Sequence, residues 1–262
     1  MRPFLTALLL VASGLLQPAL AQTPLSNPAD STLTRPTSRP NAAWRPAVRV
    51  LLPAGLIGAA AFGCHRNNVV YEMREEMQEE TREFFPRGLR TNLDDYTRHA
   101  PVVAAYALHA VGMKPARGIG AFTICHGLAH ALNSGVVSHL KRAAAVSRPD
   151  NPKDLSSFPS AHTAQAFMTA TLLHEQFGHG RPWVSVSGYA VATATGAMRM
   201  MHNRHWLTDV VAGASIGFLS AEAVWRLYPQ VARLMPGKIG QKVFIVPTYV
   251  PGGTLGVAVA VK

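Results

Sequence analysis

Residues 141–162 read KRAAAVSRPDNPKDLSSFPSAH and join two apolar stretches of the chain. The stretch before them, residues 118–140, and the stretch into which they run, residues 159–178, both have the length of a helix and are rich in Ala, Gly, Ser and Thr. Small residues allow helices to approach closely, in a membrane bundle or in a tightly packed soluble one. The segment therefore predicts a polar connection between two packed helices.

The rest of the chain predicts more helices around this pair. A candidate amphipathic helix carries Val70, Met73, Met77 and Phe84 near one face and glutamates on the other. Four more apolar stretches have helix length: residues 50–64, interrupted by Pro53, then 100–113, 183–201 and 206–227. We predict an all-α fold, a helical bundle of about six core helices that is associated with a membrane.

The two ends of the chain differ from this core. Residues 1–21 contain an apolar stretch that ends in Ala19-Leu20-Ala21, which is typical of a cleavable signal peptide and too short to span a membrane. Residues 22–46 are rich in Pro, Ser and Thr and predict a linker. The tail, residues 240–262, alternates partly and turns at Pro251-Gly252-Gly253, which predicts a short β-hairpin. The bundle would occupy residues 47–235 of a protein exported to the bacterial envelope, in the inner membrane or the periplasm.

The composition limits the class of protein and of partner. With 48% hydrophobic and 15% charged residues, the chain is not intrinsically disordered. Its 25 Lys and Arg against 14 Asp and Glu give a net charge of +11, which favours an anionic partner. The basic residues fall singly between apolar stretches, which argues against nucleic acid and leaves a lipid bilayer or a phosphorylated substrate. Cys64 and Cys125 can form at most one bridge, and we interpret them as two small buried hydrophobic residues.

Three clusters of polar residues lie at the ends of predicted helices, where a bundle can bring them together. They combine permanent cations, histidines, a hydroxyl, helix-start N–H groups and a carboxylate, which is an inventory for phosphate binding and phosphoryl transfer. The clusters are Lys141-x6-Arg148-Pro149, Pro159-Ser160-Ala161-His162 and Arg199-x5-His205-x3-Asp209.

Each spacing has a physical reason. His205 and Asp209 are four residues apart, so on a helix they would share a face and the carboxylate could orient the imidazole as a nucleophile. Ser160 opens a helix, where the dipole favours an anion. Arg199 can bind phosphate oxygens in bidentate fashion, and His162 is left as the general acid for the leaving oxygen.

In this order the three motifs resemble those of the type 2 phosphatidic acid phosphatase (PAP2) and vanadium haloperoxidase superfamily, over roughly residues 100–230. The resemblance implies that His205 is the nucleophile that becomes phosphorylated, Asp209 its partner and His162 the acid. It also implies that no metal is needed for the phosphatase reaction. The phosphate-binding residues implied are Lys141, Arg148, Ser160, Ala161 and Arg199.

Two positions depart from the family pattern. Ala161 stands where the family usually has glycine, and its N–H can donate to phosphate only if the backbone there is helical and not at positive φ. Met198 stands where a serine usually precedes the arginine of the third motif. The connection at residues 150–158 is also short, which predicts a small substrate loop.

The resemblance and the composition leave several functions open. The first is a phosphatase that hydrolyses phosphomonoesters or diphosphates of envelope lipids through a phosphohistidine. The alternatives are a soluble exported acid phosphatase acting on small phosphoesters, a haloperoxidase with vanadate as its cofactor, and a non-catalytic anion-binding envelope protein. A mean hydropathy of only +0.11 leaves open whether the bundle crosses a membrane. His126 and His130 could suggest a metal pair, but no carboxylate or cysteine completes it, so we favour pocket-lining histidines and predict no metal.

Overall fold

The computed structural model describes residues 44–86, 88–234, 243–250 and 254–261. The predicted signal peptide and most of the predicted linker lie outside these residues. The helices are α2 (Trp44–Phe62), α3 (Val69–Phe84), α4 (Leu93–Thr97), α5 (Ala100–Ala110), α6 (Ile119–Ala144), α7 (Ala161–Leu173), α8 (Pro182–Met201) and α9 (Leu207–Leu234). A π-helix, η1 (His174–Gly178), continues α7. The predicted all-α bundle is confirmed, and each of the six core stretches overlaps one of its helices.

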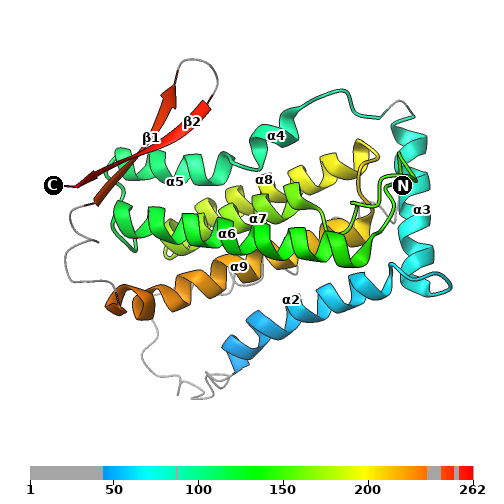
Figure 1. Cartoon of the computed structure of the whole chain (residues 1–262), viewed down its shortest axis with the longest axis horizontal. Coiled ribbons are helices and arrows are strands. Elements are labelled where there is room, and N and C mark those ends of the chain that lie inside the picture. Colours follow the sequence, from blue (N-terminus) through cyan, green and yellow to red (C-terminus); the bar gives the residue numbers. More distant parts are fainter. Residues whose placement is uncertain (1–43, 87, 235–242, 251–253, 262) are drawn as a thin grey trace, which may run out of the picture.

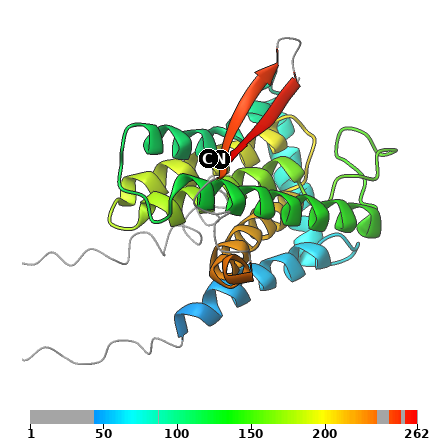
Figure 2. The same ribbon diagram turned by 60° about the vertical axis from the view of Figure 1, so that its left-hand side comes forward.

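Helix α7 lies in the middle of the bundle, between α6, α8 and α9 (Figures 1 and 2). Every residue from Thr163 to Leu173 is buried. Its closest neighbour is α9, and two glycines on α9 explain the short distance between the two helices. A Cβ atom on Gly217 would overlap the carbonyl oxygen of Ala164, and one on Gly213 would lie 2.5 Å from the carbonyl oxygen of Ser160. Small residues in this bundle therefore serve close packing around α7.

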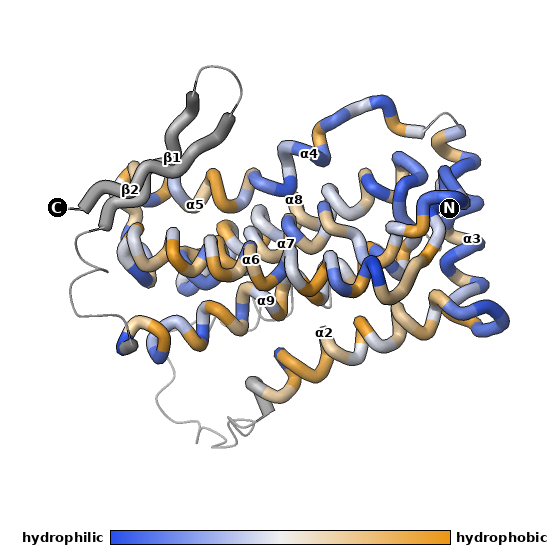
Figure 3. The backbone as a smooth tube through the Cα atoms, in the orientation of Figure 1, coloured by the Kyte–Doolittle hydropathy of each residue, from blue (hydrophilic) through white to orange (hydrophobic). Residues whose placement is uncertain are grey.

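The connections that carry the polar clusters gather at one end of the bundle. The segments between α6 and α7 and between α8 and α9 lie beside α3 at this end (Figure 1), and hydrophilic residues concentrate there (Figure 3). The predicted hairpin lies at the opposite end. Strands β1 (Val243–Val250) and β2 (Thr254–Val261) pair antiparallel, with Val243 opposite Val261. The ends of the helices thus position the candidate site, far from the hairpin.

One helix segment in the described part of the chain, Leu207–Arg233, is long and apolar enough to cross a membrane, and 78% of its apolar window is buried inside the bundle. Two shorter apolar segments are Ala47–Phe62 and Ala100–Ala110. Helix α2 runs through Pro53 and exposes Val50, Leu51 and Leu52 on its outer side. An exposed apolar face of this kind fits a membrane-associated bundle.

Both cysteines are free thiols, which answers a question that the sequence left open. Cys125 is buried in the core and Cys64 is partly buried. Burial raises the pKa of the Cys64 thiol to about 11, so it stays protonated and unreactive at neutral pH.

Candidate active site

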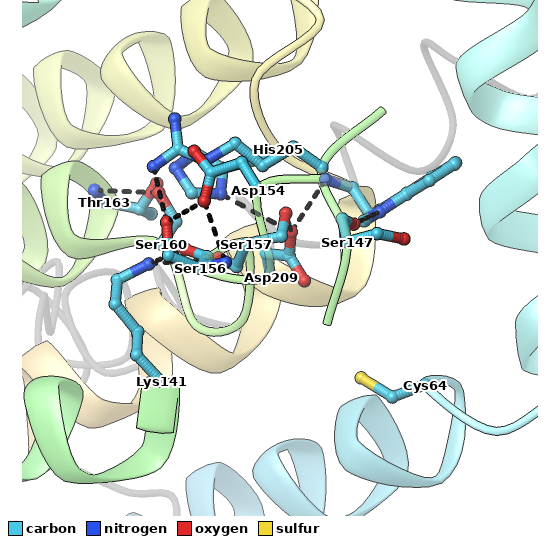
Figure 4. A network of polar contacts seen from close by, with 12 residues as sticks. Cys64, Lys141, Ser147, Asp154, Ser156, Ser157, Ser160, Thr163, His205 and Asp209 are labelled. Atoms are coloured by element: carbon cyan, nitrogen blue, oxygen red, sulfur yellow. Dashed lines mark hydrogen bonds and ion pairs between the residues drawn. The ribbon is translucent and has the colours of Figure 1, made fainter. Parts of the chain in front are cut away.

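The three sequence clusters meet at the α3 end of the bundle (Figure 4). Lys141 lies in the last turn of α6, which continues to Ala144, so it belongs to the helix instead of following it as predicted. Ser160 is the N-cap of α7, and Arg199 lies in the last turn of α8. His205 lies in the turn before α9. The bundle therefore joins residues that are up to 68 positions apart in the sequence.

His205 and Asp209 face one another, although not on one helix. Helix α9 begins at Leu207, so the predicted shared helix face is wrong: His205 precedes the helix and Asp209 lies in its first turn. The distance from His205 Nδ1 to Asp209 Oδ2 is 3.4 Å. Asp209 is completely buried, and its Oδ2 accepts hydrogen bonds from Ser157 Oγ at 2.5 Å and from the Trp206 N–H at 3.0 Å. These bonds and the positive end of α9 hold the carboxylate against the imidazole ring.

The surroundings of His205 keep its imidazole neutral. The side chain is only 2% exposed, and burial lowers its pKa to about 4. The nearby charges of Lys141 and Arg199 act in the same direction, whereas Asp209 opposes them. A neutral ring with Nδ1 turned to a carboxylate leaves Nε2 free as a nucleophile at neutral pH.

The cations of the first cluster are anchored to the short connection before α7. Lys141 Nζ donates to the carbonyl oxygens of Ser156 and Ser157. Arg148 lies 3.0 Å from the Asp154 carboxylate through Nε and donates to Ser156 Oγ at 3.1 Å through Nη2. Burial lowers the pKa of Lys141 to about 8, so this side chain remains mainly protonated at pH 7. The connection therefore fixes two positive charges near the histidine.

The start of α7 presents backbone donors to the same place. Thr163 Oγ1 donates to Ser160 Oγ at 2.9 Å, so the hydroxyl hydrogen of Ser160 remains available to another acceptor. Ala161 is the first residue of α7, and its φ is not among the positive values. The backbone at Ala161 is therefore helical, as it must be if an alanine replaces the usual glycine here. Its N–H can point along the helix axis toward an anion.

His162 has a partner that the sequence did not predict. Its Nε2 lies 2.8 Å from Oδ1 of Asp95, which is on α4 and 67 positions earlier in the chain. Burial lowers the pKa of His162, while the hydrogen bond with Asp95 raises it. The same hydrogen bond lowers the pKa of the Asp95 carboxyl, so Asp95 is charged at neutral pH. The hydrogen bond with Asp95 therefore offsets part of the effect of burial, which still leaves the pKa of His162 below its ordinary value.

Arg199 is held by a second unpredicted carboxylate, the neighbouring Asp94. Asp94 is 2% exposed, accepts a hydrogen bond from Arg199 Nη1, and lies 3.6 Å from His202 Nδ1. Nothing in the local spacing pointed to these aspartates, because their partners are on distant helices. A run of acidic residues from Glu72 to Asp95 reads locally as a solvated surface.

A cavity of about 640 Å³ lies beside α4, next to His162 and Arg199, and the residues that line it do not include His205. His162 and Arg199 line it together with Asp94 and Asp95. Arg90 and Arg204 add two more positive charges to its wall. The three arginines of this cavity attract a phosphorylated group to the side of the site that holds His162.

Two groups of side chains bear on metal binding. Among the described residues, Asp94, Asp95 and His162 form the one group whose ligand atoms lie within 4.8 Å of one another. Asp94 and Asp95 are already paired with Arg199 and His162. The rings of His126 and His130 are 6.4 Å apart and take part in no such group in this part of the chain.

Comparisons with known proteins place the chain near a family of phosphatases. The family model described as "PAP2 superfamily" matches residues 122–233. Over 136 residues the chain is 38% identical to the lipid A 1-phosphatase of Porphyromonas gingivalis, which covers 52% of this chain but only 30% of that protein. The chain thus matches less than a third of the length of this curated relative.

Two solved structures are also similar. The crystal structure of Aquifex aeolicus LpxE matches with a TM-score of 0.39 and 22% identity, over 56% of this chain and 93% of that one. The crystal structure of a transmembrane PAP2-type phosphatidylglycerolphosphate phosphatase from Bacillus subtilis matches with a TM-score of 0.45 and 18% identity, over 74% and 99% of the two chains.

Proposed function

We propose that the chain is a phosphatase of the PAP2 superfamily that removes phosphate from lipids of the bacterial envelope through a phosphohistidine at His205. The observation that carries this proposal is the neutral, buried imidazole of His205, which faces Asp209 and whose pKa is lowered by the nearby charges of Lys141 and Arg199. The apolar outer side of α2 and the lipid phosphatase among the relatives favour a lipid over a small soluble phosphoester.

The proposed reaction has two steps. The phosphate group binds to Arg199, Arg148 and Lys141 and to the N–H groups that open α7. The His205 Nε2 attacks phosphorus, and the bond from phosphorus to the leaving oxygen breaks while His162 gives that oxygen its proton. Asp209 stabilises the positive charge that develops on the phosphorylated ring.

In the second step water hydrolyses the bond between phosphorus and Nε2 of His205. His162, now neutral, takes a proton from the attacking water, the bond from Nε2 to phosphorus breaks, and inorganic phosphate leaves. Both steps use only side chains and backbone N–H groups of this chain. We therefore expect the reaction to proceed in the presence of a metal chelator.

The proposal is tested by phosphate release from two substrates in parallel. Purified protein in detergent with EDTA is given a short-chain lipid phosphate and a soluble phosphomonoester. We expect faster release from the lipid. Equal rates would identify a soluble acid phosphatase type, and no release from either would contradict a phosphatase. Halide oxidation by peroxide after addition of vanadate would instead identify haloperoxidase chemistry.

The pairing of His162 with Asp95 predicts a change in the pH dependence. His162 must be protonated to act as the acid, so kcat/KM falls as the pH rises through its pKa. Because the hydrogen bond with Asp95 raises that pKa, Asp95→Asn should lower it. The alkaline limb of the pH profile of kcat/KM should then move to lower pH, with a smaller effect at acidic pH.

Glu83→Gln provides the matched control for this experiment, since Glu83 is an exposed carboxylate on α3. Glu83→Gln should leave the pH profile of kcat/KM unchanged. Asp95→Glu keeps a carboxylate, so its alkaline limb should lie between those of wild type and Asp95→Asn. A profile of Asp95→Asn that is lower at every pH but keeps its midpoint would show that Asp95 is merely structural.

A further inference from the structure

The buried side of α3 is polar, although the sequence predicted an apolar one. Figure 1 shows this helix beside the end of the bundle where the polar clusters meet. Of the four apolar residues expected on one face, Met77 is buried, whereas Met73 and Phe84 are 46% and 58% exposed. The other buried residues of the helix are Arg74, Gln78 and Thr81. Polar groups cost free energy when they are buried without partners, so their contacts show what this helix holds.

Gln78 holds the turn between α8 and α9, which carries His205. Its side chain is 1% exposed, and its Nε2 donates to Asn203 Oδ1 at 2.7 Å and to the carbonyl oxygen of Met200 at 3.3 Å. Arg82, one turn further along α3, donates to the same Asn203 oxygen at 3.2 Å. Two residues on one face of α3 therefore converge on one side chain of this turn.

The backbone conformation of Asn203 makes these hydrogen bonds important for the site. Its φ is 60°, in the left-handed region that asparagine adopts more readily than most residues. His205 follows two positions later and lies outside the helices. A rotation of the backbone at Asn203 would therefore move the imidazole relative to Asp209, whose Oδ2 is 3.4 Å from His205 Nδ1.

Arg74 holds the residue on the other side of His205. Its side chain is 5% exposed, and its Cζ lies 4.6 Å from the centre of the Trp206 ring and 4.2 Å from that of Tyr71. The face of an aromatic ring attracts a cation in this position. Trp206 in turn donates from Nε1 to the carbonyl oxygen of Ser147 at 2.8 Å. Helix α3 thus contacts residues on both sides of the nucleophile.

The burial of Arg74 costs stability. Its Nε and Nη1 are buried without a hydrogen-bond partner in the described part of the chain, and the Glu75 carboxylate lies 3.6 Å from its Nη2. An apolar side chain of similar length would leave no unpaired N–H groups here. The residues that line the cavity beside α4 include neither Arg74 nor Gln78. An effect of these two side chains on the reaction must therefore pass through the turn that they hold.

We propose that Gln78 and Arg74 are positioning residues, which hold the turn around His205 so that Nε2 of its ring meets phosphorus in line with the leaving oxygen. This inference rests on the proposed function and adds to it the residues that fix the nucleophile. Gln78 acts through Asn203, and Arg74 acts through Trp206. A displacement of about 1 Å in a reacting group can slow a reaction about a hundredfold.

The experiment removes each contact separately. Gln78→Leu removes the donor to Asn203, and Asn203→Gly removes the acceptor while glycine keeps the left-handed backbone. Arg74→Met removes the cation and fills the same space. Glu79→Leu is the matched control, because Glu79 is an exposed residue of the same helix. The measurements are kcat and KM for phosphate release from the short-chain lipid phosphate, and the melting temperature of each variant.

We expect kcat to fall about tenfold to a hundredfold in Gln78→Leu, Asn203→Gly and Arg74→Met, while KM changes less than about twofold. Glu79→Leu should keep both constants. The double variant Gln78→Leu/Asn203→Gly should lose no more than the more affected single variant, since both changes break the same contact. Arg74→Met should keep or raise the melting temperature, so unfolding would not account for its loss of kcat. Unchanged kcat in all three variants would overturn the inference while the proposed function stands.

A second measurement needs no turnover, so it separates failure of this inference from failure of the proposed function. His205 is 2% exposed and His139 is exposed, so diethyl pyrocarbonate should modify His205 far more slowly in wild type. A loosened turn should raise the rate at His205 relative to His139 by at least about fivefold in Gln78→Leu and Arg74→Met. Protection of His205 equal to that of wild type in both variants would overturn the inference even if no substrate were hydrolysed.

Discussion

Phosphate release from the lipid substrate should fall by at least about three orders of magnitude when His205 is replaced by alanine. The imidazole is the proposed nucleophile, and it faces the buried carboxylate of Asp209, with Lys141 and Arg199 nearby. Replacing such a group removes the covalent intermediate itself, not one of several contacts to it. The measurement is kcat for phosphate release, together with rapid-quench mass spectrometry of the peptide that contains residue 205.

The control for this prediction is His139→Ala, which replaces an exposed histidine of α6 that is not among the proposed site residues. It should keep wild-type kcat and the labelled peptide. Wild type should carry one added phosphate on the peptide containing His205 during turnover, and His205→Ala should carry none. Retention of more than about a tenth of the rate by His205→Ala would contradict the proposed intermediate.

The helices could be predicted from the sequence because their signals are local. Apolar stretches of helix length predicted six core helices, and the bounds found by the structure differ by only a few residues in most of them. Helix α2 differs from the predicted stretch, residues 50–64, because it begins at Trp44 and continues through Pro53. The π-helix at His174–Gly178 also has no sequence signal, since its residues continue the apolar pattern of α7.

The three polar clusters were found in the sequence by residue type and not by periodicity. A phosphate site needs cations, a nucleophile and helix-start donors, and these residue types stand out where helices end. Their partners do not stand out. Asp94 and Asp95 reach Arg199 and His162 only through the packing of α4 against α7 and α8. Contacts across 105 and 67 positions are consequences of tertiary structure, which one sequence does not encode in any spacing.

The short connection at residues 150–158, which the sequence predicts to be a small substrate loop, also has a structural role. In the structure it braces the site: Asp154 holds Arg148, Ser157 donates to Asp209, and the carbonyl oxygens of two serines bind Lys141. Its brevity therefore helps to fix three of the proposed site residues.

Replacing Asp209 by asparagine should lower kcat by at least about a hundredfold while the KM for the lipid changes little. In a Ser-His-Asp triad the same exchange costs about 10⁴-fold. Asparagine keeps the size of the side chain, and its amide oxygen can still accept from Ser157 Oγ and from the Trp206 N–H. What disappears is the negative charge 3.4 Å from His205 Nδ1. That charge is needed only when the ring becomes positive on phosphorylation, so the loss should appear in kcat.

Ser157→Ala separates this charge from the hydrogen bonds around it. The variant removes one donor to Asp209 but leaves the carboxylate ionised beside the imidazole. We expect a loss of about tenfold or less in kcat, because the Trp206 N–H still holds Oδ2 in place. If Asp209→Asn and Ser157→Ala lost the same activity, Asp209 would serve only to orient the His205 ring. A much larger loss in Asp209→Asn would assign the stabilisation of the phosphorylated ring to the charge of Asp209.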